Sequence, residues 1–532
     1  MKLKINWWLL IIVILALFLR LYKLGELPYG FHVDEAKAGW NAYSVLKTGK
    51  DDWGKTIGMY YNSFGDFRPS AVIYSNIPSI FVFGKNIFAV RFPAALLGAL
   101  TVIPIFLIVK LISKNEKWGL AAAGLMAISP WHLMVSRATS EVVMALFFSL
   151  LGLYFLLKRK VIPSVLFWVI SFWFYHSIRV LAPLFILATI FFYWKEKSKK
   201  LWMILGIVVL MSGGLFIGKE ARGRLSQVSI KSDAKITLES VNMPNQEGPG
   251  QVLVARAFHN KLVVLGRRMV EEYTNYFSTN FLVGSSAKPD RYMTQNFGLI
   301  TYIELILLVL GIVALGKYSG ARWAMFLLLL APLPAAMTIE DVPNLHRSLW
   351  MIPFIVIIET YGLIILWEIK KYLVMVAILF LTINWIYFGH MYVVHQKFAM
   401  AAYTRDGGME SLVATIDKLQ NNYDKIVVTN YPDGIYPWLG FLGNRDPNLL
   451  NSQAKNRING DWQFENLEMV NEKCPTNWAF AKFASVKRLL VVNGEGCEID
   501  QAIIKKENLK LVEVIKRPDL SPPFKLWGRV IE

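Results

Sequence analysis

The sequence predicts a mainly α-helical, polytopic membrane protein with a small C-terminal α/β domain. Of its 532 residues, 55% are hydrophobic and only 18% are charged, whereas soluble domains carry about 25% charged residues. Long uncharged runs explain this deficit, and such runs are typical of helices that cross a bilayer. From about residue 400 onward the composition is that of a soluble domain.

Eleven apolar runs are the predicted membrane-spanning helices. They cover residues 7–21, 88–111, 118–135, 142–157, 161–175, 180–194, 201–217, 299–315, 323–336, 349–367 and 372–389. Two long polar loops, 22–87 and 218–296, separate some of these runs. We therefore expect a membrane domain over residues 1–398 and an extracytoplasmic α/β domain over 399–532.

The net charge of +19 has a membrane explanation. The cations stand in short clusters between apolar runs, for example at 158–160, 195–200 and 370–371, and cytoplasmic loops carry such clusters. Binding of nucleic acid, the other common reason for a basic chain, needs a basic stripe on a soluble face. We therefore exclude a nucleic-acid partner and expect a multi-pass protein of the cytoplasmic membrane.

The apolar segment 71–83 decides the orientation of everything after it. It has about thirteen residues, fewer than the ~17 that a spanning helix needs. If it crossed the membrane, the later basic clusters would lie outside. We expect an interfacial or re-entrant helix instead, because this choice keeps all of the clusters inside.

The C-terminal domain contains helix and strand patterns in alternation, together with two cysteines. Residues 412–419 have helical spacing, and 424–429 and 488–493 read as buried strands. Cys474 and Cys497 show no metal-binding spacing. They form a disulfide if the domain faces an oxidising compartment, or they are two unrelated thiols.

Adjacent carboxylates, Asp34 and Glu35, follow the first membrane exit. On a helix, neighbouring side chains point about 100° apart, so the two acids cannot share one task. One could act as a general base while the other positions a hydroxyl or a metal. Stabilisation of a helix N-terminus would explain both acids equally well.

Four arginines lie at outer ends of the predicted spans: Arg68, Arg137, Arg179 and Arg347. A guanidinium can bind a phosphate group through two hydrogen bonds, so these residues are candidates for an anionic lipid headgroup. For Arg68, snorkelling to lipid headgroups is the alternative. The cations accompany the carboxylate Asp66, and their shared side of the membrane is a stronger signal than any one of them.

Other polar side chains share these outer ends. They are His32, His132, His176 and Glu141. Interfacial hydrogen bonding explains the histidines, and metal ligation stays open for His132 and His176.

Several motifs, taken in their order along the chain, resemble those of a known protein family. Phe31-His-Val-Asp-Glu35, Asn41-Ala-Tyr-Ser44, Gly65-Asp66, Arg68-Pro69 and Phe88-Ala-Val-Arg-Phe-Pro93 resemble the dolichyl-phosphate-mannose protein mannosyltransferases and the related bacterial aminoarabinose transferases. Ser129-Pro-Trp131 with Arg137, and Pro334-Ala-Ala-Met-Thr338 with Arg347, are similar to bacterial members. The resemblance covers roughly the first four hundred residues.

The resemblance implies a GT-C glycosyltransferase that takes a sugar from a polyprenyl phosphate outside the cytoplasmic membrane and inverts the anomeric centre. It implies Asp34 as the base, Glu35 as a residue that places the acceptor, and Arg68 and Arg347 as ligands of the donor phosphate. Ser70 stands where relatives often have a second proline.

The other candidates extend this site. We add Arg137 and Arg179 to the phosphate ligands, and Asp66, His32, His176 and Glu141 to the acceptor side. No cofactor is required by the sequence. A divalent metal stays open, with Asp34 and Asp66 as candidate ligands.

Two other functions remain alternatives. A transporter or flippase of lipid-linked sugars would need ionisable residues near the bilayer midplane and often a repeated half, and the predicted spans hold few such residues. An oligosaccharide ligase of another fold would share the sidedness but lack the early acid pair. The expected partners are a polyprenyl-phosphate sugar, membrane lipid and a protein, glycan or lipid acceptor.

Overall fold

The computed structural model describes residues 6–56, 58–63, 65–196, 198–216, 229–247, 252–398, 404–429, 435–454, 461–470, 474 and 477–530. Its contacts divide the chain into two compact units. The first unit comprises residues 1–22, 65–69 and 94–392, and the second comprises 23–64, 70–93 and 393–532. Most of the first polar loop therefore belongs to the same unit as the C-terminal region. The predicted boundary at residue 398 would have separated the two.

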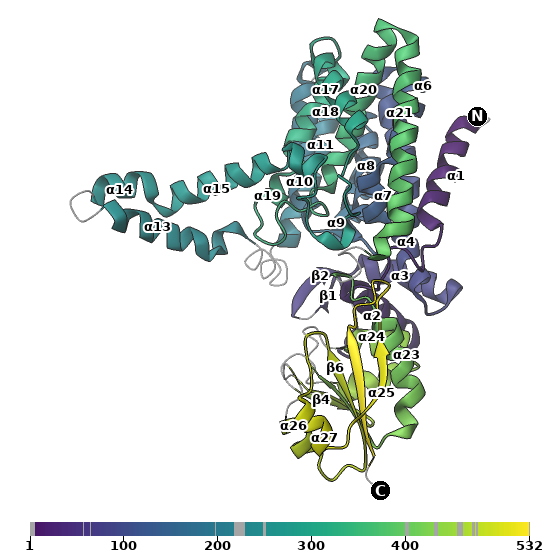
Figure 1. The fold of residues 1–532 in the computed structure, drawn as a ribbon. Coiled ribbons are helices and arrows are strands. Elements are labelled where there is room, and N and C mark those ends of the chain that lie inside the picture. Colours follow the sequence, from purple (N-terminus) through teal and green to yellow (C-terminus); the bar gives the residue numbers. More distant parts are fainter. Residues whose placement is uncertain are drawn as a thin grey trace. The chain divides into compact units, whose positions relative to one another are not determined.

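The first unit is a bundle of apolar helices (Figure 1). Its helices are α1 (Trp7–Leu21), α5 (Val102–Ser113), α6 (Glu116–Ile128), α7 (Pro130–Ser136), α8 (Glu141–Leu157), α9 (Val161–Phe174), α10 (Ile178–Phe192), α11 (Lys199–Phe216), α13 (Ala234–Glu247), α14 (Val252–His259), α15 (Lys261–Asn275), α16 (Thr279–Leu282), α17 (Tyr302–Val313), α18 (Ser319–Leu330), α19 (Leu333–Ala336), α20 (Ile352–Ile369) and α21 (Lys371–His390). The short strand β2 (Asp66–Pro69) also belongs to this unit.

Each predicted span coincides with a helix or a helix pair. Four described helices are long and apolar enough to cross a membrane, and a bent pair would make a fifth. That pair is α6 and α7, which meet at 55°. Ser129 caps α7 and Pro130 follows it, and a proline without an N–H group starts a helix more easily than it continues one. The total of eleven spans stays a prediction.

A close helix crossing holds α17 against α20. A side chain added at Gly311 would meet the carbonyl of Ile358, and one added at Gly362 would meet that of Leu307. Glycine at both positions lets the two backbones approach, as small residues do where membrane helices pack.

The second unit combines helices with a six-stranded sheet. Its elements are α2 (Val33–Thr48), β1 (Tyr60–Ser63), α3 (Ala71–Phe83), α23 (Met409–Leu419), β3 (Lys425–Thr429), α24 (Tyr436–Leu442), α25 (Pro447–Gln453), β4 (Trp462–Phe464), β5 (Leu467–Val470), α26 (Asn477–Lys482), β6 (Arg488–Gly494), α27 (Gln501–Lys506), β7 (Lys510–Ile515) and β8 (Phe524–Val530). Helix α4 (Ile87–Leu100) belongs to both units.

The sheet has the strand order β4-β5-β3-β6-β8-β7. β3 is parallel to β5 and β6, with Ile426 opposite Leu467 and Leu490. The central strands β3 and β6 are almost continuously buried, as expected for parallel strands covered on both faces. The structure thus contains the two predicted strands and the predicted helix at 412–419.

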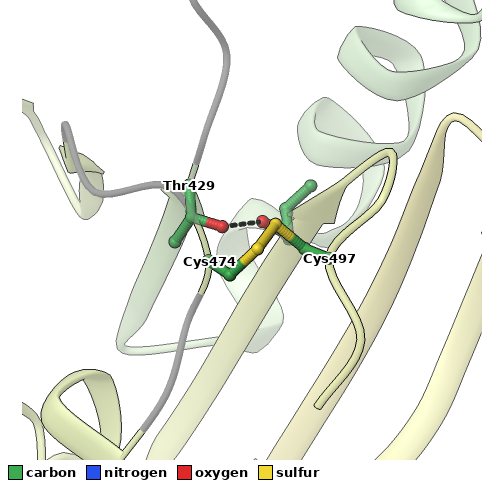
Figure 2. Close-up of a disulfide and its surroundings, with 4 residues drawn as sticks. Thr429, Cys474 and Cys497 are labelled. Atoms are coloured by element: carbon green, nitrogen blue, oxygen red, sulfur yellow. Dashed lines mark hydrogen bonds between the residues drawn. A yellow bond between two sulfur atoms is a disulfide. The ribbon is translucent and has the colours of Figure 1, made fainter.

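A disulfide closes this domain. Cys474 and Cys497 are bonded, and Figure 2 shows the bond beside Thr429, whose hydroxyl donates to the carbonyl of Val492. Of the two possibilities left by the sequence, the structure therefore shows the pair rather than two thiols.

Helix α2 joins the first polar loop to the C-terminal region within the second unit. The indole of Trp40 donates to the hydroxyl of Tyr436 at 2.9 Å, and the indole of Trp438 donates to the carbonyl of Phe31 at 2.7 Å. The ammonium of Lys37 is buried against Asp52. These contacts fix the helix whose first turn carries the acid pair.

Candidate active site

The two adjacent acids lie in the first turn of α2, and His32 is its N-cap. The backbone N–H of Asp34 donates to Nδ1 of His32 at 3.2 Å, and the N–H of His32 donates to Oε2 of Glu35 at 3.3 Å. This reciprocal arrangement is a capping box. A carboxylate there also faces the positive end of the helix dipole, so stabilisation of the helix start accounts for part of the motif.

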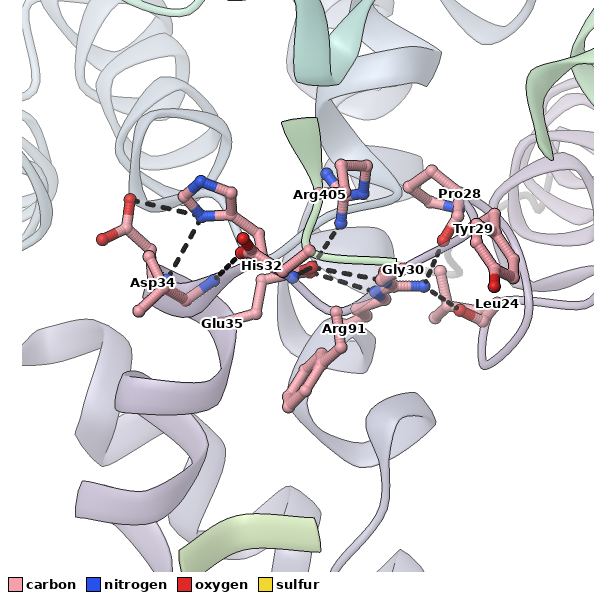
Figure 3. Close-up of polar contacts among 12 residues, drawn as sticks. Leu24, Pro28, Tyr29, Gly30, His32, Asp34, Glu35, Arg91 and Arg405 are labelled. Carbon is pink, nitrogen blue, oxygen red and sulfur yellow. Dashed lines mark hydrogen bonds and ion pairs between the residues drawn. The ribbon is translucent and has the colours of Figure 1, made fainter. Parts of the chain in front are cut away.

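Glu35 is enclosed and bound by two arginines (Figure 3). Nε of Arg91 donates to Oε1 at 3.0 Å, and Nη2 of Arg91 donates to Oε2 at 3.1 Å. Nη2 of Arg405 also donates to Oε2. The exposed fractions are 2% for Glu35, 0% for Arg91 and 1% for Arg405. Such an enclosed carboxylate offers no surface to an acceptor, so its contacts differ from the expected acceptor role.

Arg91 also fixes the preceding loop. It donates to the carbonyls of Leu24 at 3.1 Å, Pro28 at 3.0 Å and Gly30 at 2.5 Å. Each nitrogen of its guanidinium is engaged, which makes this one side chain the link between residues 24–30, α2 and α4. We call Glu35, Arg91 and Arg405 the acid–arginine lock.

Gly30 lets the lock close. Its φ is +84°, and a Cβ at this position would lie 2.5 Å from the carbonyl oxygen of Arg405. Only glycine adopts this backbone conformation without strain and leaves room for that carbonyl.

Asp34 has the opposite environment. Its side chain keeps 29% of its surface exposed, and its Oδ2 lies 3.6 Å from Nδ1 of His32. In Figure 3 its carboxylate points away from the lock. Of the two neighbouring acids, Asp34 is therefore the one that can reach a substrate.

Glu410, in the first turn of α23, lies close enough to the lock to feel its charges. Burial raises the pKa of this carboxyl, repulsion from Glu35 adds to the increase, and attraction to Arg91 and Arg405 opposes it. The lock therefore carries an additional acid whose ionisation is disfavoured.

In the first unit, Arg68 and Asp66 form a partly buried ion pair. Nε of Arg68 lies 3.1 Å from Oδ2 of Asp66, and their side chains are 27% and 13% exposed. Nε2 of His176 lies 3.4 Å from the carbonyl oxygen of Phe67. The segment with Arg68 therefore lies beside the turn between α9 and α10.

Arg137 and Arg179 bind helix ends instead. Arg137 donates to the carbonyls of Leu19 and Tyr22, both at 2.6 Å. Arg179 donates twice to the carbonyl of Phe172, at 3.2 and 2.9 Å. The last carbonyls of a helix lack intrahelical partners, and cations there are favoured by the dipole.

The same two arginines are enclosed, with exposed fractions of 2% for Arg137 and 1% for Arg179. Both guanidinium groups are therefore engaged within the protein, and the expectation that they bind the donor phosphate stays a prediction. Arg20, which the sequence reading did not single out, caps α6 in the same way, because it donates to the carbonyl of Ala127 at 3.0 Å.

Arg347 is held at the start of the segment before α20. Its Nη1 donates to Oγ1 of Thr338 at 2.8 Å, and its Nη2 lies 2.8 Å from Oε2 of Glu340. The neighbouring His346 stacks on Tyr292 and lies 3.0 Å from the hydroxyl of Ser140, the N-cap of α8. Because Glu141 follows Ser140, the outer ends of α8 and of the segment before α20 meet.

The described residues do not bring three metal-binding side chains together. Asp34 has His32 as its near neighbour, and Asp66 has Arg68. Among the described residues, neither carboxylate belongs to a group of three candidate metal ligands, so a divalent metal stays a prediction and we derive no step through one.

Residues 10–178 match the family model of the dolichyl-phosphate-mannose-protein mannosyltransferases. No curated protein matches the chain. The structure of ArnT from Cupriavidus metallidurans bound to undecaprenyl phosphate is 12% identical, has a TM-score of 0.52 and covers 99% of each chain. The apo structure of ArnT is 10% identical, has a TM-score of 0.51 and covers 99% of this chain and 98% of ArnT. About the first third of the chain thus matches this mannosyltransferase family, and nearly the whole chain shares the fold of ArnT, which together support a glycosyltransferase.

The archaeal oligosaccharyltransferase AglB from Archaeoglobus fulgidus, solved with an inhibitory peptide and a dolichol-phosphate, shows a weaker likeness. Its identity is 11% and its TM-score 0.48, over 92% of this chain and 70% of AglB. The family match of this chain includes Asp34, Arg68 and Arg137 and ends before Arg179. Arg347 lies beyond the matched residues, so its role as a phosphate ligand stays a prediction from the sequence motif.

Sequence reasoning missed the lock's two arginines for different reasons. Arg91 stands inside a quoted family motif, but its neighbours in sequence are apolar and gave it no chemical role. Arg405 lies more than three hundred residues after Glu35, and no periodicity or motif links the two.

Proposed function

We propose that this glycosyltransferase moves a sugar from a polyprenyl phosphate to an acceptor hydroxyl on the extracytoplasmic face of the cytoplasmic membrane. The observation that carries the proposal is the contrast between Asp34, which is accessible, and Glu35, which is buried in the lock. ArnT with bound undecaprenyl phosphate supports the class of donor.

The chemical step is a displacement at the anomeric carbon. The acceptor oxygen forms a bond to that carbon while the bond from the carbon to the phosphate oxygen breaks, and the polyprenyl phosphate leaves with the electron pair. Asp34 takes the hydroxyl proton as general base, which contributes about 10²–10⁴-fold. A single displacement inverts the anomeric configuration.

Arg68 and Arg347 neutralise the donor phosphate in this proposal. Each now pairs with a carboxylate, Asp66 or Glu340 respectively, and each would exchange that partner for the phosphate. Charge-assisted bonds to a leaving phosphate become stronger as charge builds on it. We assign Arg137 and Arg179 to helix capping, and Glu35 to positioning Asp34.

The remaining candidates belong to the acceptor side. His32 orients Asp34 through the helix cap, and Asp66, His176 and Glu141 are proposed to contact the acceptor.

Two observations support the proposed orientation. The basic turns 158–160 and 198–200 line one shared hollow of the first unit, as they should if both belong to the cytoplasmic face. The disulfide belongs to the second unit, and disulfides persist where the surroundings are oxidising.

The variant Asp34→Asn tests the base. We expect a loss of about 10²–10⁴-fold in the rate of transfer, measured with a radiolabelled polyprenyl-phosphate sugar, with donor binding and thermal stability unchanged. The matched control is Glu26→Gln, because Glu26 is an exposed acid of the same loop, paired only loosely with Lys23 at 3.6 Å. Near-normal transfer by Asp34→Asn would reject the mechanism.

The C-terminal region is proposed either to bind the acceptor or to cover the catalytic residues, and a truncation after Tyr392 is one way to separate these roles. The lock complicates that experiment, since removal of Arg405 would release Glu35 as well. A sharper comparison replaces surface residues of the sheet, such as Lys510 and Lys525, and measures the KM for the acceptor. An unchanged KM would favour covering over binding.

A further inference from the structure

Helices α13, α14 and α15 form an arm that leaves the helical bundle of the first unit sideways. In Figure 1 the arm runs roughly across the direction of α20 and α21. Inside the arm, Ile236 of α13 packs against Val264 of α15, with Leu265 and Met269 beside them. This small core leaves the outer sides of the helices unburied.

The outer side of α15 is an apolar stripe. Leu262 is 79% exposed and Val270 is 64% exposed. Leu262, Gly266, Val270 and Tyr273 follow one another at steps of four, four and three, which places them on one helix face. The preceding helix α14 also exposes large apolar side chains, Leu253 at 85% and Phe258 at 67%. Large apolar side chains gathered in this way indicate a binding surface.

Tyr273 fixes the direction of the stripe. Its hydroxyl donates to the carbonyl of Leu329 at 2.8 Å, and Leu329 lies in the last turn of α18, one of the helices suited to cross the membrane. The face of α15 that carries Leu262 and Val270 therefore looks toward the apolar bundle rather than away from it. In Figure 1, α14 and α15 form the upper layer of the arm and α13 the lower layer, and α20 and α21 extend upward from the level of the arm.

Cations border the stripe. Arg256 and Lys261 are exposed at the adjoining ends of α14 and α15. Arg267 instead pairs with Glu239 of α13 within the arm. A helix with an apolar face and basic residues at its edge is suited to an anionic lipid surface, where it lies in the interface with its apolar face about 5–10 Å deep.

We propose that α14 and α15 lie on the outer leaflet of the membrane, with Leu253, Phe258, Leu262 and Val270 among the acyl chains and with Arg256 and Lys261 at anionic headgroups. The arm then extends the enzyme over lipid that the spanning helices do not touch. A second copy of the chain is the competing occupant of the stripe.

The test uses the full chain in nanodiscs of phosphatidylethanolamine and phosphatidylglycerol. The variant Leu262→Cys is labelled with an environment-sensitive fluorophore; both native cysteines form the disulfide, so labelling is selective. Acyl-chain-brominated lipids should quench this probe by about half or more, because its depth lies in the acyl region. The matched control is Asn245→Cys on α13, nine residues from Ile236 and so on the opposite side of that helix, and we expect no quenching there.

Three results would overturn the proposal. The first is a Leu262 probe that stays unquenched, and the second is equal quenching of both probes. The third is protection of Leu262→Cys that appears only with rising protein concentration or is accompanied by cross-links between copies, which would assign the stripe to a second chain. The double variant Arg256→Gln/Lys261→Gln should reduce quenching in discs containing phosphatidylglycerol and leave it unchanged in discs of phosphatidylcholine.

Discussion

The two units bury their arginines in different ways. In the second unit, Arg91 and Arg405 enclose the carboxylate of Glu35. In the first unit, Arg137 and Arg179 bind backbone carbonyls near the C-terminal ends of helices. The first arrangement neutralises a buried charge next to the more accessible Asp34, whereas the second satisfies helix ends. The comparison indicates that an arginine near a helix end is not for that reason a phosphate ligand, and that its partners in the structure bear on its role.

Breaking the lock should have the largest effect. We expect Arg91→Met to lower the free energy of unfolding by about 3–5 kcal/mol, because it leaves Glu35 buried with a poorer set of partners. The loss of stability is measured by thermal unfolding in detergent, with proteolytic cleavage within residues 23–64 as the readout of unfolding. The double variant Glu35→Gln/Arg91→Met should recover part of it, since no buried charge then lacks a partner. A loss no larger than that caused by Lys23→Met would contradict the lock.

The next effect concerns the donor. Arg347→Gln should weaken donor binding by about 1.5–3 kcal/mol, the range for a hydrogen bond to a charged group, and this appears as a higher KM for the polyprenyl-phosphate sugar. Its thermal stability should stay close to that of the wild type, because Arg347 pairs with the half-exposed Glu340. An unchanged KM would remove Arg347 from the donor site.

A capping arginine should show the reverse behaviour. Arg137→Gln removes bonds to the carbonyls of Leu19 and Tyr22, so we expect a loss of stability of about 1 kcal/mol with little change in the donor KM. Steady-state kinetics and thermal unfolding, measured on the same variants, distinguish an arginine that caps a helix from one that binds the donor phosphate. A raised donor KM at unchanged stability would return Arg137 to the phosphate ligands.

The smallest effect is a pH dependence at the edge of the lock. Burial raises the pKa of Glu410 above its ordinary 4.5, so the folded protein holds this proton more tightly than the unfolded chain does. The resulting stabilisation is complete below pH 4.5 and is lost as pH rises through the folded-state pKa. Glu410→Gln should therefore flatten the fall in stability with rising pH. An identical pH profile for the variant and the wild type would contradict this account.

The sequence predicted the helices well because apolar runs of sufficient length have few alternatives. Residues 142–157 and 372–389 were expected to be helical, and α8 and α21 begin and end within about a residue of those limits. The break at Ser129 was missed, since a proline after an apolar run signals a bend only where a cap such as Ser129 supports it.

The candidate site was predictable only in part. The position of Asp34 followed from its motif and from the first exit of the chain. The partners of Glu35 did not follow, because the contact with Arg405 depends on the folding of a distant segment around Gly30. The contacts of Arg137 and Arg179 with helix carbonyls were not predictable for a related reason: composition shows that a cation is present but does not show which carbonyls surround it.

The position of Arg405 in the chain has a consequence for folding during synthesis. The ribosome makes Asp34 early and Arg405 about 370 residues later, so the first turn of α2 waits for most of the chain before its lock is complete. We therefore expect residues 24–30 and the start of α2 to reach their final arrangement only after the C-terminal region has been made and folded.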